Sequence, residues 1–162
     1  LQGEHYLSDL LGQLVHANRE RSKKLGCPRI PLLLKIAPDL SYHEIDSILE
    51  ILQNLELDGI IATNTTLQRP GRLQRMDESG GLSGKPLHKI SVQIVDYIYK
   101  KTEGKIPIIG LGGIDDPVSA GRMVDAGASL IQIYSGMIYR GAFLAKDLAQ
   151  SLSWRHREWL KH

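Results

Sequence analysis

Residues 106–117 of the chain read IPIIGLGGIDDP, and this stretch decides the fold. Its first half, Ile106–Leu111, is a short apolar run rich in β-branched residues, which predicts a buried strand. Asp116 followed by Pro117 is the usual start of a helix, and Gly127 supplies the stop. A strand, a glycine-containing loop and a helix in succession form one unit of a parallel α/β sheet.

Three further apolar runs of similar length lie at Pro31–Ile36, Gly59–Thr63 and Leu130–Tyr134. Segments with the apolar period of a helix alternate with them. The helix between the first two runs is expected to begin at Ser41, because Glu44 three residues later completes a capping box. The chain is therefore predicted to be an α/β protein in which parallel strands alternate with helices.

Further helices are expected at Glu4–Lys24, Leu87–Ile98 and Ala142–Trp154. An irregular stretch, residues 67–86, precedes the second of these helices. Connections of that length are usually functional or mobile.

Two architectures accept this pattern, an open doubly wound sheet and a piece of a (β/α)8 barrel. A complete barrel needs about 250 residues, whereas the chain has 162. Four strands would form half a barrel with two unpaired edges, which is a liability for a free-standing chain. Length alone therefore favours the doubly wound sheet.

The composition narrows the function classes. Twenty Lys and Arg against eighteen Asp and Glu leave a formal net charge of +2, so a nucleic-acid partner is not expected. The single cysteine and the six histidines lack the spacing of a metal site, so no metal is expected. The longest apolar runs have the length of strands, and no membrane span is predicted.

Polar residues follow the first two predicted strands, where α/β folds place their sites. Lys35 ends the first strand and either extends to solvent or supplies a positive charge to a bound anion or electron-rich ring. Residues 63–66 read TNTT. They form either a local turn or a set of hydrogen-bonding groups for the edge of a planar ligand.

Glycine loops follow the other two strands, at Gly110–Gly113 and Tyr134–Gly136. They are either tight turns or a site where the backbone approaches an anion, and in a barrel this is the recurrent phosphate position. The segment 80–86, GGLSGKP, is not a phosphate loop of the GxxxxGK[ST] kind. Pro86 stands where that motif needs a hydroxyl residue.

Six segments together carry a resemblance to a known family: KIAPDL at 35–40, TNTT at 63–66, GGLSGKPL at 80–87, PIIGLGGI at 107–114, AGA at 126–128 and YSG at 134–136. In this order they resemble the carboxyl-terminal part of the quinone-dependent, class 2 dihydroorotate dehydrogenases. The resemblance implies a (β/α)8 TIM barrel. Residues 1–162 would supply strands five to eight of its single FMN-binding domain, which reverses the preference drawn from length alone.

The resemblance also implies an activity. It is the FMN-dependent oxidation of dihydroorotate to orotate in pyrimidine biosynthesis, with electrons passed to a quinone. The implied location is peripheral to a membrane. The cytoplasmic side of a bacterial inner membrane is the first expectation, and the mitochondrial inner membrane is the second. Two alternatives remain. One is another flavin-binding or phosphate-binding barrel, and the other is a non-catalytic half barrel that only binds a ligand.

The roles that the resemblance assigns can be given residue by residue. FMN binding falls to Lys35, Thr63, Ser83, Gly84, Gly112, Gly113, Tyr134 and Ser135, and orotate binding to Asn64 and Thr65. The catalytic base of the family, a serine, is expected upstream of Leu1, together with the amino-terminal half of the barrel and the membrane-docking segment. The isolated chain is therefore expected to be inactive.

Overall fold

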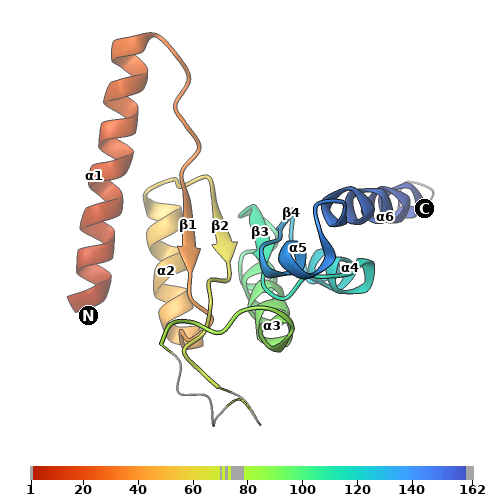
Figure 1. Ribbon diagram of the computed structural model, residues 1–162. Coiled ribbons are helices and arrows are strands. Elements are labelled where there is room, and N and C mark those ends of the chain that lie inside the picture. The colour runs from red at the N-terminus through yellow and green to blue at the C-terminus, as the bar shows by residue number, and fades with distance from the viewer. Residues whose placement is uncertain (1, 70, 72, 74–78, 160–162) are drawn as a thin grey trace.

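The computed structural model describes residues 2–69, 71, 73 and 79–159, and it forms one sheet with helices (Figure 1). The predicted stretch 67–86 lies partly outside the described residues. The elements in chain order are α1 (Gln2–Leu25), β1 (Leu33–Ile36), α2 (Tyr42–Asn54), β2 (Gly59–Ala62), α3 (Lys85–Lys101), β3 (Ile108–Leu111), α4 (Pro117–Asp125), β4 (Leu130–Gln132), α5 (Ser135–Arg140) and α6 (Leu144–Trp159).

The strands lie in the sheet in their chain order, β1-β2-β3-β4, and each pairs in parallel with the next. The predicted α/β fold with alternating strands and helices is confirmed. A doubly wound sheet reverses its strand order at a switch point, and this sheet does not. The architecture favoured by length alone is therefore wrong, because chain length carries no information about strand order.

The core lies on one face of the sheet. Ile36, Ile60 and Ile108 are buried there against α2, α3 and α4, and Figure 1 shows α2 and α3 on the same side of the strands. The opposite face is open and mostly apolar, with Leu33 37% and Leu130 65% exposed. A sheet covered on one face only is unusual for parallel strands, which are normally buried on both.

Helix starts and stops follow the sequence signals. Ser41 and Glu44 form the predicted capping box at the start of α2. Asp116 caps α4 by accepting a hydrogen bond from the Ser119 backbone N–H at 2.7 Å. Gly127 follows α4 with a φ of +108°, a conformation that favours glycine.

The strands are shorter than predicted at both edges of the sheet. Pro31 has no N–H to donate to a ladder, and the Asp58 carboxylate accepts the Leu32 N–H at 2.8 Å, so β1 begins only at Leu33. Strand β4 ends at Gln132, because Tyr134 already precedes the first turn of α5.

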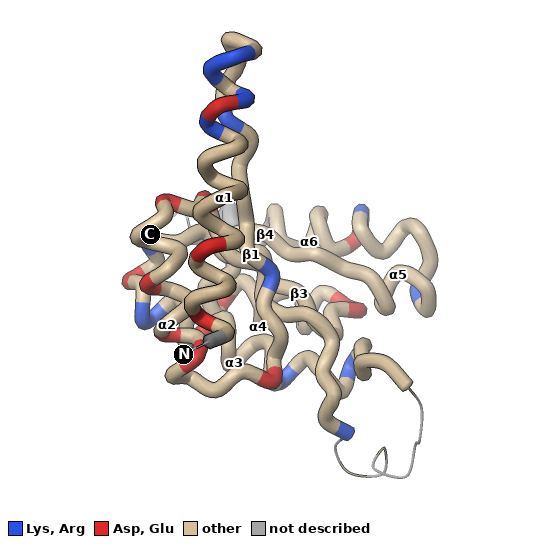
Figure 2. The backbone as a smooth tube through the Cα atoms, turned by 90° about the vertical axis from the view of Figure 1, so that its left-hand side faces the viewer, with Lys and Arg blue, Asp and Glu red and all other residues tan. Residues whose placement is uncertain are grey.

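Helix α1 lies beside α2 and buries Leu11 and Val15, whereas Tyr6 and Leu14 remain exposed. Figure 2 shows basic and acidic residues interspersed along the helices. Within the described ranges, no helix combines the length and the apolar character needed to cross a bilayer.

Candidate functional site

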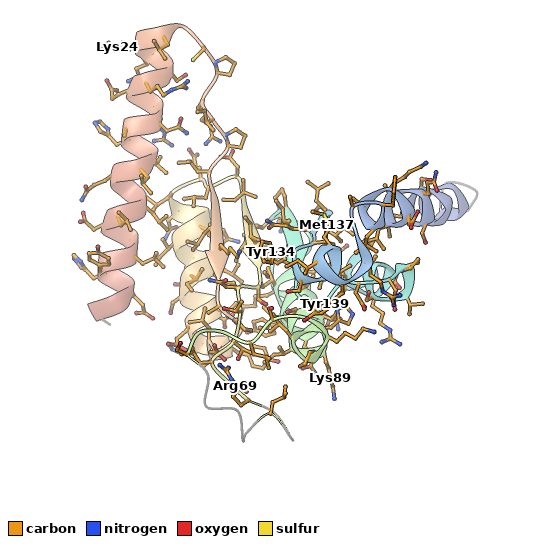
Figure 3. All side chains as sticks on the ribbon, viewed as in Figure 1. Lys24, Arg69, Lys89, Tyr134, Met137 and Tyr139 are labelled. Atoms are coloured by element: carbon orange, nitrogen blue, oxygen red, sulfur yellow. The ribbon has the colours of Figure 1, made fainter. Side chains whose placement is uncertain are left out.

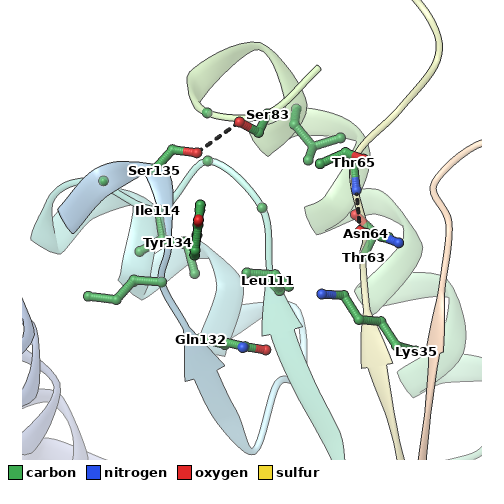
Figure 4. Close-up of a pocket in the computed structure, with 16 residues that line it drawn as sticks. Lys35, Thr63, Asn64, Thr65, Ser83, Leu111, Ile114, Gln132, Tyr134 and Ser135 are labelled. Carbon is green, nitrogen blue, oxygen red and sulfur yellow. Dashed lines mark hydrogen bonds between the residues drawn. The ribbon is translucent and has the colours of Figure 1, made fainter. Parts of the chain in front are cut away.

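A pocket of about 260 Å³ opens at the carboxyl ends of the strands (Figure 4). It brings together all ten residues that the sequence singled out: Lys35, Thr63, Asn64, Thr65, Ser83, Gly84, Gly112, Gly113, Tyr134 and Ser135. These residues come from five separate segments of the chain, so their convergence is a property of the fold.

Six more residues line the pocket: Leu87, Leu111, Ile114, Gln132, Ile133 and Gly136. The sequence prediction assigned none of them a role, although Gly136 lies in a loop that it quoted. Gln132 carried a usable signal, because it is polar within an otherwise apolar strand. It pairs with Leu111 and stands on the open face of the sheet.

Lys35 is the third residue of β1 and pairs with Ile61 of β2. Figure 4 shows its side chain reaching from β1 toward Leu111 on β3. The amine therefore lies over the strand ends, inside the pocket lining. Of the two alternatives left open by the sequence, this placement favours a fixed positive charge for a ligand.

The loop after β2 is held by its backbone and presents its side chains selectively. Thr63 is fully buried, and its hydroxyl makes a 2.8 Å hydrogen bond with the Ser91 hydroxyl of α3. The Asn64 N–H donates to the Ile36 carbonyl at 2.7 Å. The Asn64 side-chain oxygen accepts the Thr65 N–H at 2.9 Å, so the NH₂ group is the remaining donor of this side chain.

Asp39 of the KIAPDL segment anchors the same loop from the other side. Its carboxylate accepts hydrogen bonds from the Thr66 hydroxyl and from the Leu67 N–H. The Thr66 backbone exchanges two hydrogen bonds with Leu82, at 3.1 and 2.7 Å. The loop carrying Asn64 and Thr65 is thus fixed at its base by side-chain and backbone contacts.

The loop after β3 is built for close packing. Gly112 and Gly113 have φ of +135° and +63°, where side chains are strained. A Cβ on Gly113 would lie 2.6 Å from the Gly84 carbonyl oxygen and 2.7 Å from the Cβ of His88. Both positions therefore require glycine, and the backbone itself forms this wall of the pocket.

The loop after β4 meets the segment before α3. The Ser83 and Ser135 hydroxyls lie 2.8 Å apart (Figure 4). Gly84, with φ of +79°, leads into α3, and Ser135 begins α5. The first N–H groups of a helix have no partner within it, so this end of the pocket offers hydroxyl and backbone donors together.

A second cavity, of about 470 Å³, adjoins the pocket. It shares six lining residues with the pocket: Ser83, Gly84, Gly113, Ile114, Ser135 and Gly136. Its rim carries Asp115, whose carboxylate lies 3.0 Å from the Lys85 amine and 3.9 Å from the Arg140 guanidinium. Lys85 and Arg140 therefore both face the Asp115 carboxylate at this end.

Asp116 follows in the same loop, and its pKa is lowered, chiefly because its carboxylate accepts the Ser119 backbone N–H and also contacts the Ser119 hydroxyl. Asp116 is thus charged when it caps α4. It stabilises α4, the helix that begins where the loop after β3 ends.

Comparison with known proteins identifies the family. A model of dihydroorotate dehydrogenase matches residues 1–155. The chain belongs to the dihydroorotate dehydrogenase family. Curated relatives named dihydroorotate dehydrogenase (quinone) are similar to it: one from Psychrobacter sp. is 42% identical over 98% of this chain, and one from Photobacterium profundum is 46% identical over 93%.

Solved dihydroorotate dehydrogenases are similar to the chain in structure as well. The Eimeria tenella enzyme, crystallised ligand-free and with ferulenol, superposes with a TM-score of 0.72 and 43% sequence identity over 76% of this chain. The match covers 33% of the ferulenol-bound dihydroorotate dehydrogenase. The four parallel strands with their helices therefore correspond to part of a dihydroorotate dehydrogenase structure.

The chain spans a little under half of the length of the curated relatives it matches, 46% of the Psychrobacter dihydroorotate dehydrogenase and 45% of the Photobacterium one.

Proposed function

We propose that residues 1–162 form the carboxyl-terminal half of one FMN-binding (β/α)8 barrel and supply its strands five to eight. Two observations support this proposal. The strands follow chain order without reversal, as they do around a barrel. The sheet face opposite the core is mostly apolar and open, and in a barrel that face lines the packed interior.

We infer that the chain takes part in the oxidation of dihydroorotate to orotate. The observation that carries this inference is the convergence of the ten predicted residues on one pocket at the strand ends. The pocket's volume of about 260 Å³ is below the usual range of about 300 to 1,000 Å³ for a ligand site. A second half would supply the missing walls.

The donor set fits FMN. At the β3–β4 end, hydroxyls of Ser83 and Ser135 and backbone N–H groups of Gly113 and Ser135 suit a phosphate. Gly84, Gly112 and Tyr134 complete that end of the pocket. FMN, when bound, supplies the acceptor for the hydride that leaves C6 of dihydroorotate.

The β1–β2 end suits the flavin ring and the substrate. Lys35 places a positive charge where negative charge collects as the ring is reduced, and Thr63 lines the ring beside it. The NH₂ group of Asn64 and the hydroxyl of Thr65 donate to the carbonyl and carboxylate oxygens of orotate. The loop held by Asp39 thereby orients the substrate.

The proton at C5 needs a base within hydrogen-bond reach. No carboxylate, histidine or cysteine lines the pocket among the residues that the structure describes, and Lys35 is assigned to the flavin. We propose that the base comes from the amino-terminal half, upstream of Leu1, and that the chain alone does not turn over.

Electrons then leave to a quinone, as the names of the relatives state for those proteins. We propose a peripheral membrane location, with a membrane-docking segment in the amino-terminal part. Exposed apolar side chains on α5 and directly after it would suit contact with an apolar segment: Ile138, Tyr139 and Phe143 are 72%, 84% and 77% exposed. Figure 3 shows Met137 and Tyr139 on α5.

A chimera tests the activity. The part of the Photobacterium profundum protein that this chain does not match is joined in front of residue 1, and the chain alone is the matched sample. Both are mixed with FMN, and dihydroorotate is added without oxygen. We expect the flavin absorbance of the chimera to bleach at a steady rate and that of the chain alone to stay unchanged.

Two results would overturn the proposal. One is a chimera that is folded by circular dichroism yet binds no FMN. The other is full-rate bleaching by the chain alone, which would place the base within these 162 residues. The unaltered Photobacterium profundum protein serves as the positive control.

A further inference from the structure

His88 lies in the first turns of α3, outside the pocket lining, and contacts the proposed phosphate loop. Its Nδ1 atom lies 3.0 Å from the Gly112 carbonyl oxygen. A carbonyl only accepts hydrogen bonds, so Nδ1 carries the proton and donates. His88 also packs against the next residue, since a Cβ on Gly113 would meet the His88 Cβ at 2.7 Å and its N at 2.9 Å.

The other ring nitrogen of His88 has no such contact. Nε2 is buried and has no hydrogen-bond partner among the described residues. A buried polar atom without a hydrogen-bond partner is unfavourable. An apolar side chain of similar size would fill the same space without this cost. The contact that distinguishes histidine from such a side chain is the one between Nδ1 and the Gly112 carbonyl.

That contact fixes more than one atom. The Gly112 carbonyl and the Gly113 N–H belong to one planar trans peptide and point in opposite directions. Fixing the oxygen toward α3 therefore fixes the Gly113 N–H away from it. Glycine at both positions would otherwise allow this peptide to rotate, because glycine restricts its backbone least.

We propose that His88 is a positioning residue that orients the Gly113 N–H for the phosphate of FMN. The proposal rests on the phosphate assignment made above. It predicts that His88 contributes to the recognition of the phosphate and not to the recognition of the flavin ring, which lies at the opposite end of the pocket.

Four variants of the 162-residue chain separate these contributions, because the phosphate end is built from residues of this chain. In His88→Asn the amide nitrogen stands where Nδ1 stood, in His88→Gln it stands where Nε2 stood, and His88→Leu keeps only bulk. Lys89→Ala is the matched control, since Lys89 is exposed on α3. Affinity for FMN and for riboflavin, which lacks the phosphate, is measured by flavin fluorescence.

We expect the wild type to bind FMN more tightly than riboflavin. His88→Gln and His88→Leu should each lose about tenfold of that preference, the weakening expected for one misdirected hydrogen bond to an anion. Riboflavin affinity should stay within about twofold. His88→Asn and Lys89→Ala should keep the preference.

The outcomes are distinguishable. A wild type without any preference for FMN would remove the phosphate site itself, and this inference with it. A preference that survives in His88→Gln, or FMN and riboflavin affinities that fall together, would overturn the role of His88 alone. Should the variants unfold, the wild-type ring decides: nitrogen-15 NMR must show the proton on Nδ1, and a proton on Nε2 refutes the proposal.

Discussion

The two ends of the pocket are built from different parts of the chain. At the β1–β2 end, side chains form the wall of the pocket: Lys35, Asn64 and Thr65 extend from backbone that is itself anchored. At the β3–β4 end the wall is backbone, with Gly112 and Gly113 packed against α3. The first end is expected to fail when a side chain is shortened, and the second when one is added.

This difference matches the chemistry proposed for each end. A ring with several polar edges is distinguished by individually placed side-chain donors, whereas a phosphate is held by several backbone N–H groups at once. Substitutions at either end of the pocket test this difference.

The largest effect is expected from Gly113→Ala. Its φ of +63° strains alanine, and the new Cβ would lie 2.6 Å from a backbone oxygen that cannot move away cheaply. Strain and overpacking together should lower the free energy of unfolding by about 2 to 5 kcal/mol, measured by urea denaturation.

Gly26→Ala is the matched control, because Gly26 has a φ of +61° but nothing within 4 Å of its Cβ position. It should lose only the strain, about 1 to 2 kcal/mol. Equal losses for the two variants would show that close packing at Gly113 is not required.

Lys35→Ala should have the next largest effect. In the chimera it removes a charge beside the ring, so flavin reduction by dihydroorotate should slow by about 100-fold, with FMN still bound. Stopped-flow absorbance under anaerobic conditions measures the rate. Lys35→Arg keeps the charge and should recover part of it, and an unchanged rate in Lys35→Ala would reject the assigned role.

Asn64→Ala should act on the substrate and spare the cofactor. A lost donor leaves orotate oxygens unpaired, which costs about 1 to 3 kcal/mol, or about 5-fold to 150-fold in orotate affinity. Titration calorimetry of the FMN-loaded chimera measures it. The FMN content should not change, and a parallel loss of flavin and orotate would contradict the separation of the two ends.

The smallest effect is expected from the capping boxes behind each end, Ser41 at α2 and Asp116 at α4. Ser41→Ala and Asp116→Ala should each lower stability by about 1 kcal/mol, measured by urea denaturation at pH 7. Neither should change the ratio of FMN to riboflavin affinity. A changed ratio would mean that helix capping, and not the loops, shapes the pocket.

The Asp116 variant should show a characteristic acid dependence. Hydrogen bonds from Ser119 hold the pKa of Asp116 below its usual value in the folded protein, so its charge stabilises the fold fully above that usual value. The contribution is lost as the pH falls through the folded pKa. The stability difference between wild type and Asp116→Ala should therefore shrink under acid, and a constant difference would contradict the hydrogen-bonded, charged cap.

Local signals predicted the elements well. The β-branched runs located all four strands, and Ser41 with Glu44 and Asp116 with Pro117 located two helix starts. These signals depend on neighbours within one turn, which sequence shows directly. Strand ends were overestimated, because Pro31 and Tyr134 change the backbone pattern at the sheet edges.

The sequence predicted residues that line the pocket but not the residues that hold the pocket loops in place. The ten pocket residues were found from their positions after strands and from the family resemblance. Asp39 and His88 were missed, because each acts on a loop distant in sequence, 27 residues away for Thr66 and 24 for Gly112. Only the fold brings such pairs together, and no local pattern marks them.

One measurement tests the division of the pocket most directly, a crystal structure of the chimera with FMN and orotate bound. The account predicts the phosphate within hydrogen-bond distance of the Gly113 and Ser135 N–H groups, the flavin ring beside Lys35, and orotate on Asn64 and Thr65. A phosphate bound at the β1–β2 end, or a flavin held outside this pocket, would contradict it.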